Sequence, residues 1–488
     1  MSAPIDSLPF PPGLPIGDAW DVSAPTAPVT FPFDGTVVAH APVGSVVHAE
    51  LALDAAVDAE AATAALPSHV RRSVLSEAAA RIATTRRAFE DLLVLETGKP
   101  LVDCRTEVSR AVVTLQSAAE EVARIHGETV PLDLLPSGEG LFGFWTRVPI
   151  GVVIGITGFN YPLLLAAHKV APSLAAGCPV VCKPAPETPL ATLWLADILR
   201  QALADAGCSP ASVQVVTGGA DVGAALTTDR RVGAVSFTGS AAVGHRIARD
   251  AAPTKTLLEL GSNSALLVCS DADLDAAAGA IVKGGFYASG QACISVQRVI
   301  VLEDVMEPLC ERLATAMKDI TVGDPRDEGA RVSSLIAPAA AARVEQWIER
   351  AVQRGARMLH RGEGRTGAVA PTVLTDVDES CDVWREEVFG PVVCMRAVAS
   401  VDEGFDTLNR SRYGLHASVF TSSLAVAFDA LRRCRVGGVV VNEVPGFRAD
   451  NMPYGGVKDS GIGREGPRFA IEELTVTRMA VIRPGSAS

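Results

Sequence analysis

Short apolar runs alternate with longer amphipathic segments through most of the chain from residue 150 onward. The clearest runs lie at 151–156, 179–182, 213–216, 232–237 and 264–268, and similar runs recur near Val299, Val393, Val419 and Val440. An apolar run without polar alternation predicts a strand buried on both faces, and the amphipathic segments, such as 163–176 and 190–206, predict helices. Because strand and helix alternate repeatedly, we expect parallel sheets covered by helices, an α/β fold class, in two lobes.

The first 150 residues show a different pattern. Residues 31–46 predict short strands around a turn at Asp34-Gly35. In residues 49–121 the apolar positions recur at helical spacing, which predicts a mostly helical segment. Residues 130–149 contain alternating aromatic positions, which predict an extended strand. The proline-rich residues 1–20 lack the positive leader and apolar core of a signal peptide, and they predict an extended arm on the surface.

Composition and charge exclude several classes of function. The chain has 488 residues, enough for about three domains of roughly 150 residues each. The formal net charge is −13, and no cluster of lysine and arginine is present. Nucleic acid and anionic membrane surfaces both require clustered positive charge, so neither is an expected partner. No apolar run reaches the roughly 20 residues that a membrane-spanning helix needs.

The ten cysteines are scattered, with no CxxC pair and no histidine at metal-ligand spacing, so we expect no metal site. Cys178 and Cys182 are close together, but their apolar surroundings favour core packing over a metal or a disulfide. Scattered free thiols in a chain without a signal peptide are typical of a cytoplasmic protein.

The stretch 257–298 carries the most specific chemistry. Glu259 follows a short apolar run, and Cys293 lies in a Gly-Gln-Ala-Cys loop after an alanine-rich helix. A thiol and a carboxylate at the ends of regular elements suit two-step covalent catalysis, so we interpret Cys293 as the nucleophile and Glu259 as the base that activates water. By themselves they are weak evidence, because most cysteines are buried and inert.

Four further features indicate a nucleotide cleft, and each has a plainer alternative. GSAAVG at 239–244 follows a strand and resembles a phosphate-binding turn, although a strand–helix turn without a ligand is about as good an interpretation. Lys183 ends a strand where it could meet ribose or phosphate, or it is an exposed loop lysine. Asn160 could donate to an oxyanion or serve only its own turn. Glu387 could hold ribose hydroxyls or lie in a solvated acidic turn.

Taken together, these features resemble the NAD(P)-dependent aldehyde dehydrogenase superfamily from about residue 31 to residue 482. The motifs that carry the resemblance are GFNYP (158–162), AGCPVVCKP (176–184), FTGS (237–240), ELG (259–261), GQAC (290–293), EVFGP (387–391) and PYGG (453–456), followed by Lys458, Ser460-Gly461 and GRE (463–465). Their order and the spacing of Asn160, Glu259 and Cys293 match the family.

The resemblance implies a mechanism that uses NAD or NADP. The Cys293 thiolate would attack the aldehyde while Asn160 and the Cys293 backbone N–H stabilise the oxyanion. Hydride would pass to the nicotinamide, and water activated by Glu259 would hydrolyse the resulting thioester to the acid. Relatives that acylate coenzyme A generally lack the equivalent of Glu259. The cofactor-binding residues implied are Thr157, Phe159, Lys183, Pro186, Gly239, Ser240, Val243, Leu260, Glu387 and Phe389.

The resemblance also implies how the chain is divided. It predicts an aldehyde dehydrogenase-like fold with a Rossmann-type cofactor lobe, an α/β catalytic lobe and a small β flap for assembly into a homodimer or homotetramer. The implied boundaries are 1–128 for the arm and helical part of the cofactor domain, 129–149 for part of the flap, 150–257 for the Rossmann-type domain, 258–442 for the catalytic domain, 443–470 for the substrate loop and return, and 471–488 for the C-terminal flap strand.

Two departures from the family pattern bear on specificity. Pro186 stands where many NAD-preferring members carry an acidic residue that bonds the adenosine ribose and repels a 2′-phosphate, so NAD and NADP both stay open. Ser262-Asn263 replaces the usual Gly-Lys, and together with MPYGGVKDSG at 452–461 it resembles a bacterial and archaeal branch that acts on small polar aldehydes. That branch includes lactaldehyde, glyceraldehyde-type and phosphonoacetaldehyde dehydrogenases.

Two arginines are candidates for holding an anionic aldehyde. Arg448 lies in the loop that shapes the substrate pocket in the family, and Arg110 maps near the opposite wall. Guanidinium groups bind phosphate, phosphonate or carboxylate through forked hydrogen bonds. The alternatives are a surface ion pair of Arg110 with Glu107, three positions earlier on the same helix, and an ion pair of Arg448 with Asp450.

We therefore predict an enzyme that oxidises a small polar aldehyde, with anionic aldehydes among the candidates. The first rival is a coenzyme A-acylating semialdehyde dehydrogenase, which a coenzyme A-dependent thioester product would identify. The second rival is a non-catalytic structural or binding protein that retains the fold. Intact Cys293, Glu259 and Asn160 argue against it.

Overall fold

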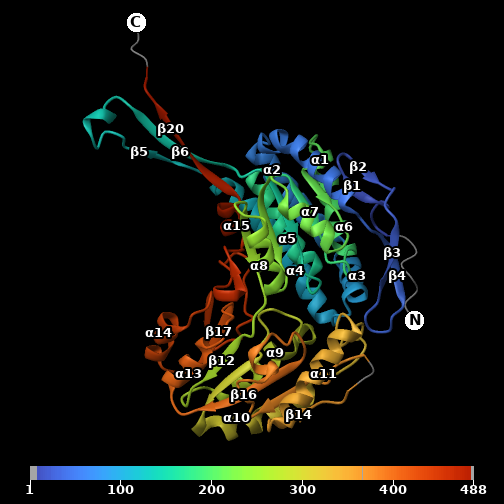
Figure 1. Cartoon of the computed structure of the whole chain (residues 1–488), viewed down its shortest axis with the longest axis vertical. Helices are drawn as coiled ribbons and strands as arrows, with labels where there is room; N and C mark the ends of the chain where they lie inside the picture. The colour runs from blue at the N-terminus through green and yellow to red at the C-terminus, as the bar shows by residue number, and fades with distance from the viewer. Residues whose placement is uncertain (1–7, 365–366, 485–488) are drawn as a thin grey trace.

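A six-stranded sheet forms the frame of one lobe (Figure 1). The computed structural model describes residues 8–364 and 367–484. The strand order is β19-β11-β10-β7-β8-β9, and all neighbours are parallel except β19, which pairs antiparallel with β11. The bounds are β7 Val152–Ile156, β8 Val180–Lys183, β9 Val213–Val215, β10 Val232–Thr238, β11 Lys255–Glu259 and β19 Gly461–Ile462. The apolar runs predicted as buried strands between 151 and 237 therefore belong to one sheet.

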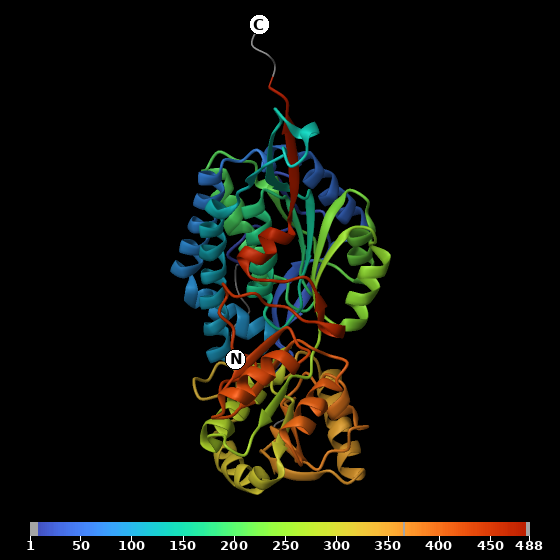
Figure 2. The ribbon, with the colours of Figure 1, turned by 90° about the vertical axis from the view of Figure 1, so that its left-hand side faces the viewer.

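Helices cover both faces of this sheet (Figures 1 and 2). They are α1 Val46–Ala64, α2 Ser68–Thr84, α3 Arg86–Thr97, α4 Leu101–Glu121, α5 Pro162–Ala176, α6 Leu190–Asp205, α7 Ala220–Thr228, α8 Ala241–Asp250 and α15 Pro467–Glu473. Val153 of β7 packs into the apolar core on the side of α4, α5 and α6, whereas its neighbours Val152 and Ile154 pack into the core on the side of α1 and α7. Because both faces are covered, the strand is apolar at successive positions.

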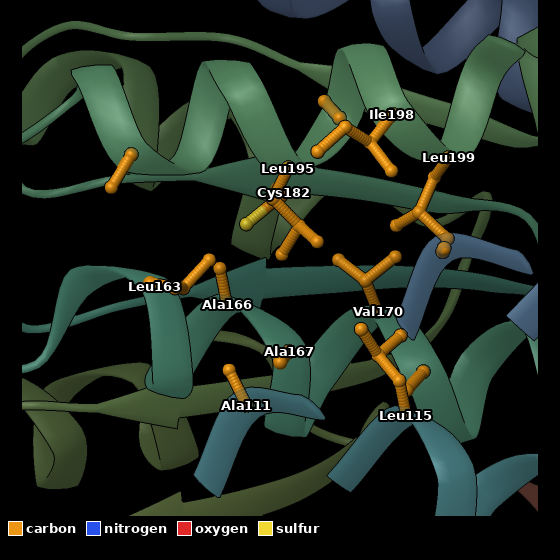
Figure 3. Packing of buried hydrophobic residues seen from close by; sticks show 14 of the residues in the cluster. Ala111, Leu115, Leu163, Ala166, Ala167, Val170, Cys182, Leu195, Ile198 and Leu199 are labelled. Atoms are coloured by element: carbon orange, nitrogen blue, oxygen red, sulfur yellow. The ribbon is translucent and has the colours of Figure 1, made fainter. Parts of the chain in front are cut away.

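The larger of these two cores is built from small and branched side chains (Figure 3). Ala111 and Leu115 of α4 meet Ala167 and Val170 of α5, and Cys182 of β8 lies among side chains of α6. Alanine at the contact lets α4 and α5 approach closely. This packing fixes the amino end of α5, which carries part of the candidate site.

A seven-stranded sheet forms the other lobe, in the order β14-β15-β16-β13-β12-β17-β18, with only β14 antiparallel to its neighbour. The strands are β12 Ala265–Val268, β13 Arg298–Leu302, β14 Arg357–Arg361, β15 Thr372–Thr375, β16 Val392–Val398, β17 His416–Phe420 and β18 Gly438–Val441. The helices are α9 Leu274–Phe286, α10 Glu303–Ala316, α11 Pro338–Gln353, α12 Asp382–Arg385, α13 Val401–Asn409 and α14 Leu424–Arg433. The prediction of two α/β lobes is confirmed.

A three-stranded antiparallel sheet projects from the first lobe and ends in the C-terminal strand (Figure 1). Its strands are β5 Glu128–Val130, β6 Phe142–Pro149 and β20 Thr475–Ile482. β20 pairs with β6 along its whole length, from Thr475 opposite Pro149 to Ile482 opposite Phe142. The strands expected near 130–149 and 475–482 therefore lie side by side, and we call this sheet the arm.

The N-terminal residues depart from the expected surface arm. Within the described part, β1 Leu14–Ile16 and β2 Ala19–Asp21 form a hairpin, the Leu14 side chain is fully buried, and the ring of Phe10 stacks on Trp20 at 6.3 Å. The expectation is wrong for these residues because the apolar side chains between the prolines pack on the first lobe. Residues 1–7 of the predicted arm lie outside the described residues.

Other local predictions agree with the structure. β3 Thr26–Thr30 and β4 Val37–Pro42 flank the turn that contains Asp34-Gly35, and helices α1 to α4 fill residues 46–121. Short 3-10 helices are η1 Val122–Arg124, η2 Pro136–Gly138, η3 Pro210–Ser212, η4 Tyr287–Gly290, η5 Met317–Asp319 and η6 Lys458–Ser460. All ten cysteines are free, and Cys178 and Cys182 are buried in the core, as predicted.

Among residues 8–364 and 367–484, no helix has both the length and the apolar character needed to cross a membrane. The domain boundaries given above stay a prediction.

Candidate active site

A cavity of about 290 Å³ lies where the carboxyl ends of β7, β10 and β11 face loops of the second lobe. The five predicted catalytic and substrate-binding residues all line it: Asn160, Glu259, Cys293, Arg110 and Arg448. These residues are up to 338 positions apart in the sequence. Ligands of α/β proteins commonly bind beyond the carboxyl ends of the strands, so the cavity lies where a reactive site is expected.

The loop that carries Cys293 begins with strained backbone. Ala288, Ser289 and Gly290 have φ angles of 48°, 57° and 73°, and side chains other than glycine rarely adopt such values. A Cβ on Gly290 would lie 2.1 Å from the carbonyl oxygen of Gly390, so this position requires glycine. Left-handed residues of this kind persist only where surrounding contacts hold them.

Three side chains hold this loop. Asp103 of α4 accepts a hydrogen bond from the Ala288 N–H at 2.9 Å, and the Ser289 hydroxyl accepts one from the Ser333 N–H at 2.9 Å. The side-chain oxygen of Gln291 accepts a third bond, from the Ile336 N–H at 3.0 Å. Burial raises the pKa of Asp103 to about 6. The position of the thiol therefore depends on contacts from both lobes.

The Cys293 sulfur lies 3.1 Å from the hydroxyl of Tyr454. Burial raises the pKa of the Cys293 thiol to about 12, although the hydrogen bond to Tyr454 acts in the opposite direction. Sequence reasoning placed Tyr454 in a motif but gave it no contact with the thiol. The motif gave no signal of the contact, because 160 residues separate the two positions along the chain.

Asn160 connects the first lobe to the same loop. Its side-chain amide donates to the carbonyl of Gln291 at 2.8 Å, two residues before Cys293. Its own carbonyl accepts a hydrogen bond from the Lys99 ammonium at 2.8 Å, and that ammonium also lies 3.7 Å from the centre of the Tyr161 ring. The side chain of Asn160 is therefore tied to the loop that carries Cys293, and its backbone is held by Lys99.

The predicted surface ion pair between Glu107 and Arg110 is wrong. Glu107 is fully buried, forms an ion pair with Lys99, and accepts hydrogen bonds from the N–H groups of Leu163 and Leu164 in the first turn of α5. A carboxylate in this position satisfies free backbone donors and opposes the positive end of the helix dipole. Tertiary packing overrides the local spacing, and Glu107 fixes the start of the helix that follows Asn160.

Glu259 ends β11 and is buried beside the cavity. Its Oε2 has no hydrogen-bond partner among the described residues, and burial, followed by the charge of Glu465, raises the pKa of Glu259 well above its ordinary value. A Cβ on Gly455 would lie 2.8 Å from Glu259 Oε1, so glycine leaves room for the carboxyl group. A buried carboxyl oxygen without a partner is suited to accept a hydrogen bond from a water molecule.

A second cleft, of about 380 Å³, shares Gly158, Phe159, Thr238 and Gly239 with the cavity. All ten predicted cofactor residues line the cleft, the cavity or both. Four line the cleft: Thr157, Lys183, Pro186 and Val243. Four line the cavity, namely Ser240, Leu260, Glu387 and Phe389, and two line both, namely Phe159 and Gly239. The Thr157 hydroxyl is buried without a hydrogen-bond partner among the described residues. The amino end of α8 also lies there, so the cleft offers unsatisfied donors suited to a dinucleotide.

Two of the plainer alternatives for the cleft residues are wrong. Lys183 is buried at the end of β8 rather than exposed in a loop, and burial lowers the pKa of its ammonium. Glu387 is half-buried rather than solvated, and burial raises the pKa of its carboxyl group to about 7. Its Oε1 accepts a hydrogen bond from the Ser262 N–H at 2.9 Å, and a Cβ on Gly261 would lie 2.3 Å from its Oε2.

The two candidate arginines lie over a buried charge cluster. Arg110 binds Asp450 through Nε at 3.1 Å and one terminal nitrogen at 2.7 Å. Arg448 binds Glu465 at 3.2 Å and lies 3.9 Å from Asp450, so the expected pairing with Asp450 is its weaker contact. Arg448 Nε has no hydrogen-bond partner among residues 8–364 and 367–484. Both arginine side chains line the cavity.

His168 and Lys169 complete this cluster. His168 lies 3.4 Å from Asp450 and 3.3 Å from Glu465, and Lys169 lies 3.1 Å from Glu465. Basic neighbours hold the pKa values of Asp450 and Glu465 well below their usual range, despite burial. Two arginines and one lysine therefore face two carboxylates in this cluster, and Glu259 lies beside the same groups. No local pattern in the sequence marks these residues, because they meet only through the fold.

The chain is similar to known proteins over almost its whole length. Residues 20–480 match a family model described as the Aldehyde dehydrogenase family. A 3-sulfolactaldehyde dehydrogenase from Priestia megaterium is 40% identical over 472 residues, which cover 96% of this chain and 98% of that protein.

Two solved structures are similar throughout. Aldehyde dehydrogenase 21 from Physcomitrella patens, in complex with the reaction product succinate, has a TM-score of 0.93 at 35% identity and covers 98% of this chain and 99% of that one. A glyceraldehyde-3-phosphate dehydrogenase from Methanocaldococcus jannaschii, complexed with NADP, has a TM-score of 0.90 at 34% identity. The match covers 94% of this chain and 99% of that one.

Proposed function

Because this chain belongs to the aldehyde dehydrogenase family, we propose that its substrate is a small aldehyde with an anionic group at the other end. The chain is an NAD(P)-dependent enzyme that oxidises aldehydes to carboxylic acids. The observation that carries the choice of substrate is that two guanidinium groups, those of Arg110 and Arg448, line the same cavity as Cys293. Guanidinium groups bind carboxylate or phosphate through forked hydrogen bonds, so the two arginines favour an anionic group on the substrate.

The charge around Arg448 supports the same proposal. Arg110, Arg448 and Lys169 bring three basic side chains to one end of the cavity, and burial strengthens the attraction of such a charge for an anion relative to the same charge in water. A cavity of about 290 Å³ is small for an organic ligand, which favours a short carbon chain. Relatives point the same way: a sulfonate is implied by the name 3-sulfolactaldehyde, a dicarboxylate by the product succinate, and a phosphate by glyceraldehyde 3-phosphate.

The proposed chemistry begins at Cys293. Its thiolate attacks the aldehyde carbon, and the side-chain amide of Asn160, which uses one N–H for the Gln291 carbonyl, donates its other N–H to the oxygen that gains negative charge. The bound nicotinamide serves as the hydride acceptor. After hydride loss the sulfur holds a thioester. Glu259 then takes a proton from water, which attacks the thioester carbon and releases the acid and the thiolate.

Replacing Arg448 with glutamine should raise KM for an anionic aldehyde by roughly 10- to 100-fold more than for a neutral aldehyde of the same length. The variant has a shorter, uncharged side chain and loses a charged hydrogen bond worth about 1.5 to 3 kcal/mol. Steady-state kcat/KM for the matched pair of aldehydes measures the effect. Any influence on the thiol itself acts on both aldehydes and cancels in their ratio.

Arg433→Gln serves as the control, because this half-buried arginine pairs with Asp402 and does not line the cavity. Its two kcat/KM values should match those of the native enzyme. An Arg448→Gln variant that loses activity equally toward both aldehydes would remove Arg448 as the anion-binding residue and with it the main support for an anionic substrate.

The adenosine end of the cleft supports use of NADP. Pro186 places no carboxylate there, and Arg246 of α8 lines the cleft and has no ion-pair partner among the residues that the structure describes. We propose that Arg246, with Lys183, attracts the 2′-phosphate.

Arg246→Ala should therefore weaken the binding of NADP by on the order of tenfold while changing the Kd of NAD little. Titration of each cofactor by intrinsic fluorescence gives both Kd values. Arg249→Ala is the matched control, since Arg249 lies on the same helix but pairs with Asp250 and does not line the cleft. Equal weakening of both cofactors by Arg246→Ala would count against the proposal.

Self-association through the arm is also proposed. Leu134, Leu135, Phe142 and Val481 of the arm are exposed apolar side chains that a second copy of the chain would cover. This supports a homodimer or a homotetramer.

A further inference from the structure

We propose that Tyr454 is a further catalytic residue, whose hydroxyl donates a hydrogen bond to the Cys293 sulfur and stabilises it as the thiolate. The proposal rests on the role of Cys293 as the nucleophile, proposed above. It assigns to Tyr454 a contact with the reacting atom before any substrate is bound.

The geometry of the contact is specific. The Tyr454 oxygen and the Cys293 sulfur are 3.1 Å apart, and this is the one hydrogen bond of that sulfur within residues 8–364 and 367–484. When the sulfur is a thiol, either atom can donate. When it is a thiolate, only the hydroxyl can donate, so the bond becomes charge-assisted and stronger.

The ring of Tyr454 has little freedom to move. Its backbone pairs with Glu465 in both directions, with N–O distances of 3.0 and 2.6 Å. The Arg448 guanidinium lies 3.7 Å from the ring centre, and the His416 ring lies 5.0 Å away, centre to centre. These contacts hold the hydroxyl at the sulfur, so little rotational freedom is lost when the bond forms.

The electrostatics keep Tyr454 a donor. Burial raises the pKa of Tyr454 well above its ordinary value, so the hydroxyl stays protonated at any working pH. Burial also raises the pKa of Cys293, and a donated hydrogen bond lowers it by favouring the charged form. When Cys293 ionises, its proton passes to water in the cavity and the electron pair stays on sulfur. Tyr454 neither gains nor loses a proton.

Other charged groups around the sulfur act on the same equilibrium. Glu387 and Glu259 would raise the pKa of Cys293 in their ionised forms, and the positive charge of Arg448 lowers it. All three are present in both variants below. Tyr287 provides a matched control, because its ring lines the same cavity and its buried hydroxyl has no hydrogen-bond partner among the described residues, the sulfur included.

The test measures the rate of Cys293 alkylation by iodoacetamide against pH in the full-length protein without substrate, followed by mass spectrometry of the peptide that carries Cys293. At pH values well below the pKa of about 12 of the Cys293 thiol, Tyr454→Phe should slow alkylation by roughly 3- to 15-fold. Loss of one hydrogen bond to a charged group raises that pKa by about one to two units, and the greater nucleophilicity of the remaining thiolate offsets part of the loss of thiolate. In Tyr287→Phe the rate should stay at the native value.

A Tyr454→Phe profile that coincides with the native one, or a Tyr287→Phe profile that shifts as much, would overturn the proposal. If Tyr454→Phe does not fold, the native protein provides a second measurement: the near-ultraviolet band of tyrosine should change when iodoacetamide modifies Cys293 at neutral pH and the Tyr454 hydroxyl loses its partner, and Cys293→Ala should lack this change. Absence of the change in the native protein would equally overturn it. Alkylation requires no turnover, so failure to oxidise aldehydes would be seen separately and would concern the proposed function alone.

Discussion

Cys293→Ala will abolish aldehyde oxidation, with a loss in kcat of at least about 10⁴-fold, while the cofactor still binds. The loss is this large because the sulfur would form both proposed covalent intermediates, and no other described cysteine lines the cavity. Alanine fits the space of the thiol without strain, so the loop and the cofactor cleft should stay intact. Formation of reduced cofactor, followed by absorbance, and a fluorescence titration of the cofactor measure the two effects.

Cys434→Ala is the matched control for this experiment. Cys434 is also a free, half-buried cysteine, but it follows α14 and does not line the cavity. Its replacement should leave kcat within about twofold of the native value, as expected for a cysteine outside the reacting site. A Cys293→Ala enzyme that keeps more than a small fraction of its activity would place the nucleophile elsewhere.

Glu259→Gln should separate the two halves of the reaction. The variant should still release a rapid burst of about one equivalent of reduced cofactor, whereas steady turnover should fall by about 10²- to 10⁴-fold, the usual contribution of a general base. Glutamine has nearly the same size as the acid and carries no charge, so the cavity should keep its shape, and burial raises the pKa of Glu259 toward the same uncharged form. Stopped-flow absorbance resolves the burst from the slow phase.

The pH dependence gives a second sign of the same role. Only the ionised carboxylate can take a proton from water, so native kcat should rise with pH through the raised pKa of Glu259, and the variant should lose this rise. Glu473→Gln is the control, because Glu473 pairs with Lys255 away from the cavity and should retain the native profile. Loss of the burst in Glu259→Gln would instead place this residue in the first half of the reaction.

The sequence predicted the buried strands well for a physical reason. Strands β7, β8 and β10 are covered on both faces, so their apolar runs have no alternation and stand out in the chain. The order of the strands could not be predicted in this way. Residues 461–462 add an antiparallel strand beside β11, about 200 positions away, and no local pattern marks that pairing.

The partners of buried charges were the least predictable part. Spacing on one helix suggested that Glu107 and Arg110 form an ion pair. In the structure Glu107 pairs with Lys99 and accepts a hydrogen bond from the first turn of α5. Arg110 instead binds Asp450, 340 positions away. In a buried site a charge binds the group that packing brings within reach, because leaving it unpaired costs more than local spacing can offset. The contact between Tyr454 and Cys293 was missed for the same reason.

The strained loop before Cys293 has a consequence for engineering. Ala288 and Ser289 adopt left-handed backbone, at a cost of about 1 to 3 kcal/mol each, and one of the bonds that holds them comes from Asp103 on a helix of the other lobe. The two lobes therefore do not behave as interchangeable modules. A chimera that takes its thiol-bearing half from a relative should therefore also take that relative's α4. Without the matching contact from α4, the loop will leave its left-handed conformation and the sulfur will change position.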